Sequence, residues 1–470
     1  MPTPNPASAS APNPSPSRPP RTAQVLIAGG GPAGATAAFH LARAGVEVTV
    51  LEKTAYPREK VCGDGLTPQA VRELQLMGLP HSAEEGWRHI KGLRLVAGER
   101  AVEVPWPQTE TWPDYALVRT RHDFDQLLAE HARAAGATIL ERHSVTTVLK
   151  DEAGTVTGLR AELLDPRGRK TGEFQDFTAP VVIAADGNST RTAVSAGLHR
   201  REDRVMGVAV RAYYESPRHT DDWMESWLRL PDADGNPLPG YGWLFPVGDG
   251  TVNVGLGILD TSPQFGKLDY RGILKDWSSA LTPTWGLSED TRTSKILGAA
   301  LPMGFNRTPQ YQPGLLLVGD SAGMVSPFNG EGISFGMEAA RLAADLVVTA
   351  LQRPTAAGRE AVLSRYPVLT QQTWGGHFAL GRHFAQLIGH PKVLEAALAV
   401  GLRTPALLRP VVQVMANLVD RPGDSLVDRT VRLLERAVPA ATTQTVLPLE
   451  SPVTPGSAPG GPVQSAPKIR

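Results

Sequence analysis

The stretch Gln24–Lys53, QVLIAGGGPAGATAAFHLARAGVEVTVLEK, decides how the rest of the chain is interpreted. Its apolar run Val25–Ala28 is typical of a buried parallel strand, and the residues that follow, as far as Ala44, favour a helix. Gly45 is expected to end that helix, and Val46–Leu51 is predicted as a second strand. Strand, helix and strand in this order predict a βαβ unit and an α/β fold.

Glycines at the turn between the first strand and the helix indicate a nucleotide site. Gly29, Gly31 and Gly34 have the G-x-G-x-x-G spacing. The first glycine permits a tight turn, the second lets a pyrophosphate approach the backbone, and the third lets the helix pack on the strand. Glu52 ends the second strand, where a carboxylate accepts a hydrogen bond from a ribose hydroxyl. Together these residues predict dinucleotide binding at the helix N-terminus.

Length and charge limit the remaining possibilities. A chain of 470 residues is expected to form two or three domains. Its 47 basic and 47 acidic residues give no net field to attract nucleic acid, so no nucleic-acid partner is expected. The one cysteine excludes an internal disulfide and suits a reducing cytoplasm. No apolar run is long enough to predict a transmembrane helix.

Two later stretches favour FAD over NAD. VVIAADGNSTRTAV contains a predicted strand, Val181–Ala185, that is followed by Asp186 and Gly187. GLLLVGDSAGMVSPFNGEGISFGMEAARLAADLV contains another, Leu315–Val318, that leads to Asp320, a glycine-rich loop and a long helix. Strands that return to one sheet so far along the chain imply a discontinuous nucleotide domain. An extended cofactor with a ribitol chain and a flavin ring needs such distributed contacts.

These three stretches together resemble FAD-dependent oxidoreductases of the glutathione-reductase superfamily, in the branch that contains p-hydroxybenzoate hydroxylase. The resemblance implies that Asp320 bonds a ribitol hydroxyl and that the loop Gly330–Gly332 offers N–H groups to the flavin. It places Arg121 near the cofactor, although a solvated arginine at a helix start fits the same sequence. The expected cofactor residues are Gly29, Gly31, Pro32, Ala33, Gly34, Glu52, Lys53, Cys62, Gly63, Arg121, Asp186, Gly187, Asp320, Gly330, Gly332 and Ile333.

One motif suggests a different chemistry. Gly319–Gly323 has the G-x-S-x-G pattern of a hydrolase nucleophile elbow, with Ser321 as the nucleophile. His377, His383 and His390 follow in an order that suits a catalytic triad. However, no H-G-G-G oxyanion element precedes the motif, and a hydrolase would leave the βαβ unit unexplained. These histidines also lack acidic partners at metal-ligand spacing, so no metal site is predicted.

The stretch YPREKVCGDGLTPQAVRELQLMGL follows the second strand and is expected to lead from the ribose towards the flavin. Gly63 and Gly65 would let the backbone around the only cysteine, Cys62, approach the flat ring closely. Thr67 is predicted to N-cap a helix whose first residue is Pro68.

Five motifs narrow the resemblance to the geranylgeranyl reductase family, and most closely to its actinobacterial menaquinone-reducing branch. They are CGDGLTP, MGVAVRAYY, LPGYGWLFP, SPFNGEGI and VMANLV, and the resemblance spans about Val25–Val419. It implies an FAD-dependent reductase that saturates isoprenoid C=C bonds, in the side chain of menaquinone or in a geranylgeranyl group. The substrate would be a polyprenyl lipid or a prenylquinone. The external reductant stays open among NAD(P)H, ferredoxin and other donors.

Two functions remain as alternatives to the reductase. An aromatic monooxygenase that uses a flavin hydroperoxide would share the fold, and substrate-dependent oxygen consumption would distinguish it. A quinone or lipid carrier that retains a structural flavin would not be an enzyme at all, and its flavin would not cycle with any reductant.

Cys62 and Asp64 are the expected catalytic residues. Alkene reduction needs a proton as well as a hydride, and a thiol with an ordinary pKa near 8.5 is largely protonated at neutral pH. Asp64 could donate a proton only if burial raised its pKa. The alternative for Cys62 is a small buried hydrophobic residue with no chemical role.

Aromatic side chains at alternate positions identify the expected substrate site. Tyr241, Trp243 and Phe245 fall on one face of a predicted strand. Such a face either packs a sheet against a core or lines an apolar tunnel for a prenyl chain. The nearby Gly255–Gly257 pair has no helix behind it and is not expected to bind a nucleotide.

The predicted fold is a discontinuous Rossmann-type FAD-binding domain with an inserted antiparallel-sheet substrate domain and a C-terminal helical region. The expected parts are a disordered Pro-rich tail at 1–21, an FAD-binding domain at 22–80, 111–200 and 295–350, a substrate domain at 81–110 and 201–294, a helical region at 351–438 and a disordered tail at 439–470. Pro391, Pro405 and Pro410 are expected to break the C-terminal helices. Those helices would pack on the substrate domain or touch a membrane surface, so a cytoplasmic protein with peripheral contact at the inner face of the membrane is an open alternative.

Overall fold

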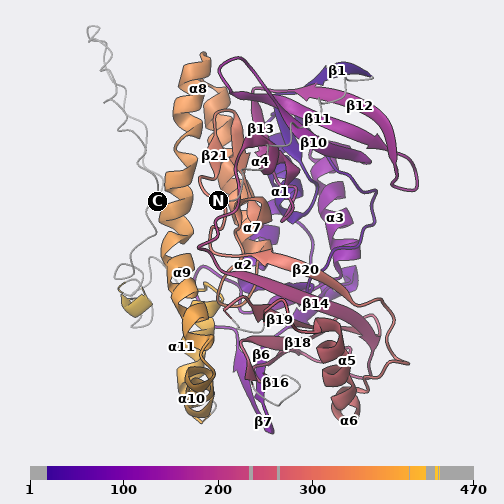
Figure 1. Cartoon of the computed structure of the whole chain (residues 1–470), viewed down its shortest axis with the longest axis vertical. Helices are drawn as coiled ribbons and strands as arrows, with labels where there is room; N and C mark the ends of the chain where they lie inside the picture. The colour runs from indigo at the N-terminus through magenta and orange to yellow at the C-terminus, as the bar shows by residue number, and fades with distance from the viewer. Residues whose placement is uncertain are drawn as a thin grey trace, which may run out of the picture.

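The computed structural model describes residues 18–231, 237–261, 265–401, 403–419, 429–431 and 433. Most of the two tails predicted to be disordered lies outside these residues. The described chain has two sheet-containing halves, with the FAD-binding half in the upper part of Figure 1 and a seven-stranded sheet in the lower part.

A six-stranded sheet forms the centre of the FAD-binding half. Its strand order is β21-β22-β13-β2-β3-β9, and all neighbours are parallel except β21 and β22. The strands are β2 (Val25–Ala28), β3 (Val48–Leu51), β9 (Thr138–Leu140), β13 (Val181–Ala184), β21 (Tyr311–Gln312) and β22 (Leu315–Leu317). The predicted strands therefore do return to one sheet from distant parts of the chain.

Alternation along β2 explains the layers on the two faces of this sheet. Val25 and Ile27 point into a core with the helices, whereas Leu26 and Ala28 point into a core with a second sheet. The helices are α1 (Pro32–Arg43), α2 (Pro68–Met77), α3 (Arg121–Ala134) and α7 (Ile333–Leu351). The second sheet, order β1-β12-β11-β10, contains β1 (Arg18–Thr22), β10 (His143–Lys150), β11 (Val156–Leu164) and β12 (Lys170–Thr178), and α4 (Arg191–Ala196) lies beside it.

The first described strand corrects the predicted start of the folded chain. β1 pairs in parallel with β12, with Arg21 opposite Phe177. All of its residues except Thr22 were assigned to the N-terminal tail, because this Pro-rich segment has no apolar run that indicates a strand. The strand is therefore held by its backbone pairing with β12 and not by burial of apolar side chains.

The seven-stranded sheet has the order β20-β14-β19-β18-β15-β6-β7 and is antiparallel except for the parallel pair β15 and β6. Its strands are β6 (Gly92–Ala97), β7 (Arg100–Pro105), β14 (Met206–Glu215), β15 (Trp223–Trp227), β18 (Gly240–Pro246), β19 (Thr251–Leu259) and β20 (Leu297–Pro302). Because β20 pairs with β14, the segment 297–302 belongs to this sheet and not to the FAD-binding range that was predicted to begin at 295.

The described chain also contains smaller elements. They are β4 (Gly65–Leu66), β5 (Arg88–Ile90) and β8 (Ala116–Val118) in a three-stranded sheet, the pair β16 (Leu230–Pro231) and β17 (Pro237–Leu238), the helices α5 (Tyr270–Ala280) and α6 (Thr282–Trp285), and the 3-10 turns η1 (Ala83–Glu85) and η2 (Gly319–Ala322).

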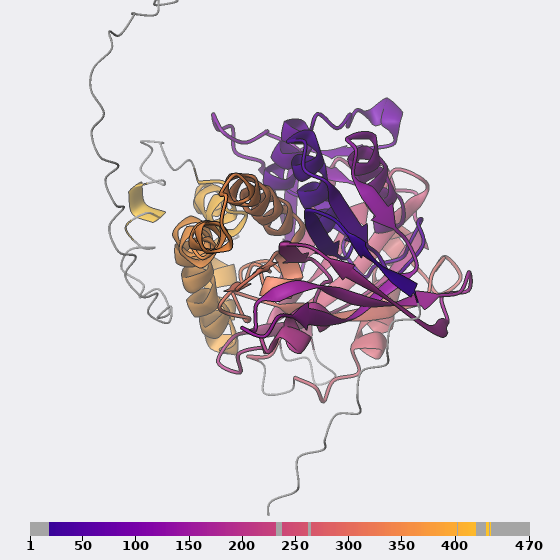
Figure 2. The ribbon, with the colours of Figure 1, turned by 90° about the horizontal axis from the view of Figure 1, so that it is seen from above.

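The C-terminal helices stand to one side of the sheets, as the orange ribbons show when the molecule is seen from above (Figure 2). They are α8 (Ala356–Leu363), α9 (Tyr366–Ile388), α10 (Pro391–Gly401) and α11 (Pro405–Met415). Leu408 and Val412 of α11 join a core with β6 and β7, so this part packs on the seven-stranded sheet. Pro410 lies inside α11 and does not break it, contrary to the prediction. Of the described helices, none is both long and apolar enough to cross a membrane.

Candidate active site

The glycine loop after β2 has two kinds of glycine. Gly29 has φ +92°, and a Cβ there would lie 2.5 Å from the carbonyl oxygen of Ala185. A Cβ on Gly34 would lie 1.9 Å from the carbonyl oxygen of Gly29. These two glycines therefore serve the contact of α1 with the sheet. A Cβ on Gly31 meets only guanidinium nitrogens, the nearest 3.0 Å away on Arg58, so this side of the loop is free of backbone and suits a ligand phosphate.

Glu52 lies at the end of β3 as the motif predicts. Its Oε2 accepts a hydrogen bond of 2.7 Å from Gly30 N, and its Oε1 accepts one of 2.9 Å from Thr54 N. The carboxylate is buried beside the glycine loop, which is where a ribose hydroxyl would need an acceptor. Lys53, in contrast, is exposed.

Two arginines supply positive charge at the same loop. Arg58 and Arg121 both pair with the buried Asp125, with N–O distances of 2.6 Å each. The Nη2 atom of Arg121 lies 4.0 Å from the Cβ position of Gly31. Arg121 is only 6% exposed, so the interpretation of it as a solvated helix-start residue is wrong. Two guanidinium groups against one carboxylate, next to the N-terminus of α1, suit an anionic diphosphate.

Asp186 and Gly187 follow β13, and their hydrogen bonds with Ser321 exclude the interpretation of that serine as a hydrolase nucleophile. Ser321 is fully buried; its Oγ donates to Asp186 Oδ1 at 3.2 Å and accepts from Gly187 N at 3.1 Å. The nearest triad candidate in sequence, His377, instead bonds Ser326 at 3.2 Å. Ser321 is therefore a structural residue that ties the loop after β22 to the loop after β13.

The loop between η2 and α7 suits a flavin and its ribitol chain. Among the described residues none donates a hydrogen bond to the Asp320 carboxylate, which faces Gly332. Gly330 has φ +72°, a conformation that favours glycine. Gly332 is the N-cap of α7, whose first residue is Ile333, so free N–H groups point out of this helix end. A carboxylate and N–H groups that are both available can bind the hydroxyls and carbonyls of the cofactor.

The segment 57–67 lies between this loop and the seven-stranded sheet, and it carries both predicted catalytic residues. Asn253 on β19 fixes it: its Nδ2 donates to the carbonyl oxygen of Cys62 at 2.9 Å and to Asp64 Oδ2 at 2.7 Å. The Oδ1 of Asn253 accepts from Trp243 Nε1 at 2.9 Å. One amide therefore joins the cysteine, the aspartate and the aromatic face.

Asp64 is fully buried and fully bonded. Its Oδ1 accepts from Arg121 N at 3.1 Å, and its Oδ2 accepts from Tyr213 OH at 2.5 Å as well as from Asn253. Burial raises the pKa of this carboxyl group to about 6, although these hydrogen bonds act in the opposite direction. Asp64 also has φ +66°, a left-handed conformation that aspartate tolerates. Burial therefore raises the pKa of Asp64 far enough for this carboxyl group to exchange a proton near neutral pH, as the sequence analysis required of a proton donor.

Cys62 lies beside Arg121 and is partly buried. Burial raises the pKa of the thiol, while the positive charge of Arg121 and the N–H of Asp64 act against that rise. The thiol is therefore protonated at neutral pH, yet its thiolate would have a cation within reach. This combination suits a group that gives up a proton and later regains it.

The aromatic face of β18 points at this segment. A Cβ on Gly63 would lie 3.0 Å from Phe245 Cε2 and 3.3 Å from Trp243 Nε1. The missing side chain of Gly63 thus makes room for the aromatic face. From the sequence, it was expected to make room for the flavin. Tyr241 OH donates to Asn329 O at 2.6 Å, so the third aromatic reaches the loop before α7. Gly255 lies beneath Trp243, so the missing side chain of this glycine makes room for the indole ring.

Glu331 is a titratable group that the sequence analysis did not identify. Thr67, the N-cap residue of α2, donates its hydroxyl to Glu331 Oε1 instead of capping its own helix. The other oxygen, Oε2, is buried and has no hydrogen-bond partner among the residues that the structure describes. Burial raises the pKa of Glu331 to about 7, and its charge helps to raise the pKa of Tyr241. The acid between two glycines in SPFNGEGI was the signal that could have identified it.

Other residues of the site were also missed. Asp125 follows Arg121 by four residues, a spacing that predicts an ion pair on a helix. Asn253 is a polar residue in the otherwise apolar strand TVNVGLGIL, which indicates a buried hydrogen-bonding role. Tyr213 gave no comparable signal, because tyrosine is common in strands.

The raised pKa values give a prediction for stability. Glu331 binds its proton more tightly in the folded than in the unfolded chain, so the stabilisation that it contributes is complete below about pH 4 and is lost as the pH rises through about 7. We expect wild type to lose on the order of 2 kcal/mol more free energy of unfolding between pH 5 and pH 8 than Glu331→Gln does. Chemical denaturation at the two pH values measures this difference. The exposed Glu99 provides the control, since Glu99→Gln should follow wild type; an unchanged pH dependence in Glu331→Gln would contradict the assignment.

The fold and this site together define an FAD-dependent oxidoreductase, in which a Rossmann-type half binds the cofactor and a sheet faces it. The family described as FAD binding domain matches residues 22–366. The chain belongs to this family of FAD-binding flavoproteins, and the predicted resemblance to menaquinone and geranylgeranyl reductases is confirmed.

Three relatives support this assignment. The chain is 36% identical to the menaquinone reductase of Mycolicibacterium smegmatis, over 88% of this chain and 97% of the relative. It is 27% identical to the digeranylgeranylglycerophospholipid reductase of Thermoplasma acidophilum, over 70% and 79% of the two chains. The crystal structure of a geranylgeranyl bacteriochlorophyll reductase-like protein from Thermoplasma acidophilum has the same fold, with a TM-score of 0.70, 21% identity, and coverage of 88% of this chain and 100% of that one. The predictions of the fold class and of FAD as cofactor are confirmed.

Proposed function

We propose that this oxidoreductase saturates a carbon–carbon double bond in an isoprenoid chain, such as the side chain of menaquinone or a geranylgeranyl group. The observation that carries the proposal is the position of the Cys62–Asp64 segment, held by Asn253 between the cofactor half and the aromatic face. Relatives named as reductases of menaquinone and of geranylgeranyl lipids support it.

In this proposal Cys62 supplies the proton that the new C–H bond requires, while reduced FAD, when bound, supplies the hydride. The thiol holds its proton at neutral pH because burial raises its pKa. After transfer, the guanidinium of Arg121 stabilises the thiolate. Asp64, with a pKa of about 6, lies two residues away with its backbone N–H 3.4 Å from the Cys62 sulfur. Asp64 orients the turn and helps to return a proton to the Cys62 thiolate.

The aromatic face is proposed to hold the isoprenoid chain. Tyr241, Trp243 and Phe245 lie side by side, with neighbouring ring centroids 6.1 and 6.3 Å apart. The rings of Trp243 and Phe245 lie next to Gly63, the neighbour of Cys62, so a prenyl chain laid along the aromatic face would bring a double bond towards the thiol. Apolar contact with aromatic rings is the main attraction available to a substrate that has no polar groups.

The decisive experiment is mass spectrometry of quinones and prenyl lipids in cells with and without the protein. The proposal expects lipids two hydrogens heavier when the protein is present. Oxygen consumption during turnover separates the reductase from the aromatic monooxygenase, the second candidate on this fold. Hydroxylated product together with substrate-dependent oxygen uptake would overturn the reductase assignment.

We also propose peripheral contact with the membrane through the C-terminal helices. Large apolar residues that are exposed in the described chain concentrate there; they include Leu387 at the end of α9, Val393 and Val400 on α10, and Val411 on α11. An isoprenoid lipid resides in a bilayer, so a face that touches the bilayer would ease its transfer to the enzyme.

The membrane proposal is tested on α10. Val393 and Val400 are 42% and 58% exposed and lie seven residues apart, on one face of the helix. The double change Val393→Asp with Val400→Asp should weaken binding to phospholipid vesicles by roughly tenfold or more, with little effect on thermal stability. Val194→Asp, at a similarly exposed valine of α4 outside the C-terminal helices, is the matched control and should leave vesicle binding unchanged. Equal sedimentation of all three proteins with vesicles would refute this contact.

A further inference from the structure

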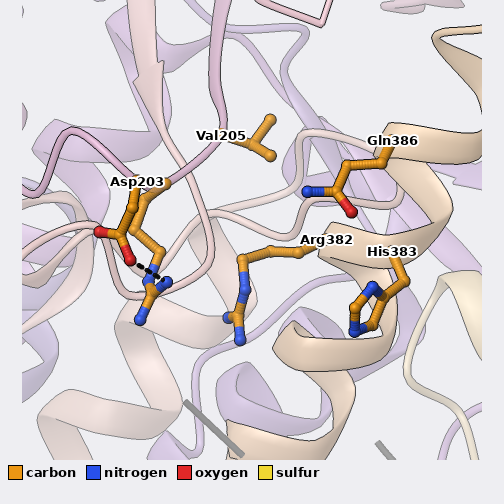
Figure 3. Close-up of a pocket in the computed structure, with 6 residues that line it drawn as sticks. Asp203, Val205, Arg382, His383 and Gln386 are labelled. Atoms are coloured by element: carbon orange, nitrogen blue, oxygen red, sulfur yellow. Dashed lines mark hydrogen bonds and ion pairs between the residues drawn. The ribbon is translucent and has the colours of Figure 1, made fainter. Parts of the chain in front are cut away.

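A surface pocket separate from the flavin site lies between the start of β14 and α9. It has a volume of about 300 Å³ and is lined by Asp203, Arg204, Val205, Arg382, His383 and Gln386. Figure 3 shows Arg382 and His383 reaching into it from α9, opposite Asp203. None of these residues belongs to the expected FAD site.

Positive charge in this pocket exceeds negative charge. Asp203 pairs with both Arg201 and Arg204, at 2.8 Å in each case. Arg382 has no carboxylate partner among the described residues and donates only to the carbonyl oxygen of Gly304, at 3.1 Å. Two guanidinium groups, those of Arg204 and Arg382, therefore line the pocket with one carboxylate, which Arg201 neutralises from outside the lining.

Arg204 points to a missing ligand. Its side chain is only 8% exposed, yet within the described part of the chain its buried Nε–H has no hydrogen-bond acceptor. A buried donor without a partner is rare in folded proteins because it loses its bond to water and gains nothing in return. An anion in the pocket would supply the acceptor.

The lowered pKa values of Arg382 and Arg204 agree with an excess of positive charge in the pocket. Burial, followed by the nearby charge of Arg204, lowers the pKa of Arg382 to about 10. Burial and the charge of Arg201 lower the pKa of Arg204 as well. The charged form of each arginine is thus destabilised by burial and by a neighbouring arginine, and a bound anion would relieve this repulsion.

We infer that this pocket binds a phosphate or diphosphate group. Guanidinium groups from two segments, Arg204 before β14 and Arg382 on α9, can bind such a group by paired N–H···O bonds, and its negative charge complements the pocket's excess of positive charge. This site goes beyond the proposed reductase activity, since neither the hydride nor the proton passes through it.

Two sources of the phosphate group fit the surroundings. Leu387, 56% exposed, lies one turn beyond His383 on α9, so a lipid headgroup in the pocket would leave its acyl chains beside an apolar residue. A soluble phosphorylated molecule would use the pocket alone. Both sources share the same chemistry at the arginines.

Calorimetric titration of the FAD-loaded full-length protein with inorganic pyrophosphate tests the site, because its diphosphate-binding loop is then already filled by FAD. We expect one saturable site per chain that sodium chloride of equal ionic strength does not reproduce. Arg382→Gln and Arg204→Gln, which approach from opposite walls, should each weaken binding about tenfold or more. The control is Arg100→Gln, a change at an exposed arginine of β7, and it should bind like wild type. FAD content confirms that each variant is folded.

Vesicles separate the two sources. If the group belongs to a lipid, vesicles that contain phosphatidic acid should bind wild type better than Arg382→Gln, and pyrophosphate should compete with them. If it belongs to a soluble molecule, pyrophosphate should bind while the vesicles do not discriminate. Absence of saturable pyrophosphate binding, or equal binding by wild type, Arg382→Gln and Arg204→Gln, would overturn the inference. Because these are binding measurements, their failure would leave the proposed reductase activity untouched.

Discussion

Gly31→Val is expected to yield a folded protein without FAD. A side chain at this position would fill the open side of the glycine loop, where its Cβ would already lie 3.0 Å from Arg58 Nη2. The diphosphate could then no longer reach the loop N–H groups, each worth about 1.5–3 kcal/mol as a charge-assisted hydrogen bond. Losing two such bonds should weaken FAD binding by roughly a hundredfold or more. The visible absorbance and the FAD content of the purified protein measure the effect.

Controls for this change come from other positions. Gly257→Ala, at a glycine whose nearest neighbour would lie 3.9 Å from the new Cβ, should keep one FAD per chain. Glu52→Ala should weaken binding less than Gly31→Val, because ribose is one of several contacts. A yellow Gly31→Val protein with full FAD content would show that the cofactor does not use this loop.

Cys62→Ala is expected to retain FAD and its reduction but to lose alkene saturation. A positioned proton donor contributes about 10²–10⁴ in rate, or roughly 3–5 kcal/mol of barrier. The loss should be specific to the chemical step, because the side chain lies beside Arg121 and close enough to Tyr241 to affect its pKa, while Asn253 holds the backbone of the turn. Single-turnover reoxidation of reduced flavin by substrate measures this step directly.

A structural cysteine would give the opposite result. Its replacement by alanine should lower the free energy of unfolding by about 1 kcal/mol and leave reoxidation near normal. Proton donation would then pass to Asp64, Glu331 or water. Since Cys62 is the only cysteine, alkylation of the whole protein reports on it alone. The raised thiol pKa predicts slow alkylation at pH 7 in wild type.

Local patterns in the sequence were enough to define the FAD-binding half. The strands β2, β13 and β22 form within one residue of their predicted bounds, because an apolar run between turn residues is buried wherever it sits in a parallel sheet. The glycine spacing and Glu52 depend on a turn of fixed geometry, so a few adjacent residues define them. The resemblance of short motifs then identified the family.

The chemistry of the candidate site required the tertiary structure. Thr67 and Glu331 are separated by 264 residues, and only the folded chain brings the hydroxyl of one to the carboxylate of the other. Asp64 gains its raised pKa from burial beneath β14 and β19, which no residue near it in sequence reveals. The same holds for the pairing of β1 with β12 and of β20 with β14, because the sequences of β1 and β20 carry only weak strand signals of their own. Periodicity and turns are properties of neighbours in the chain, whereas burial, proton affinity and the shape of a site depend on residues that only folding makes neighbours.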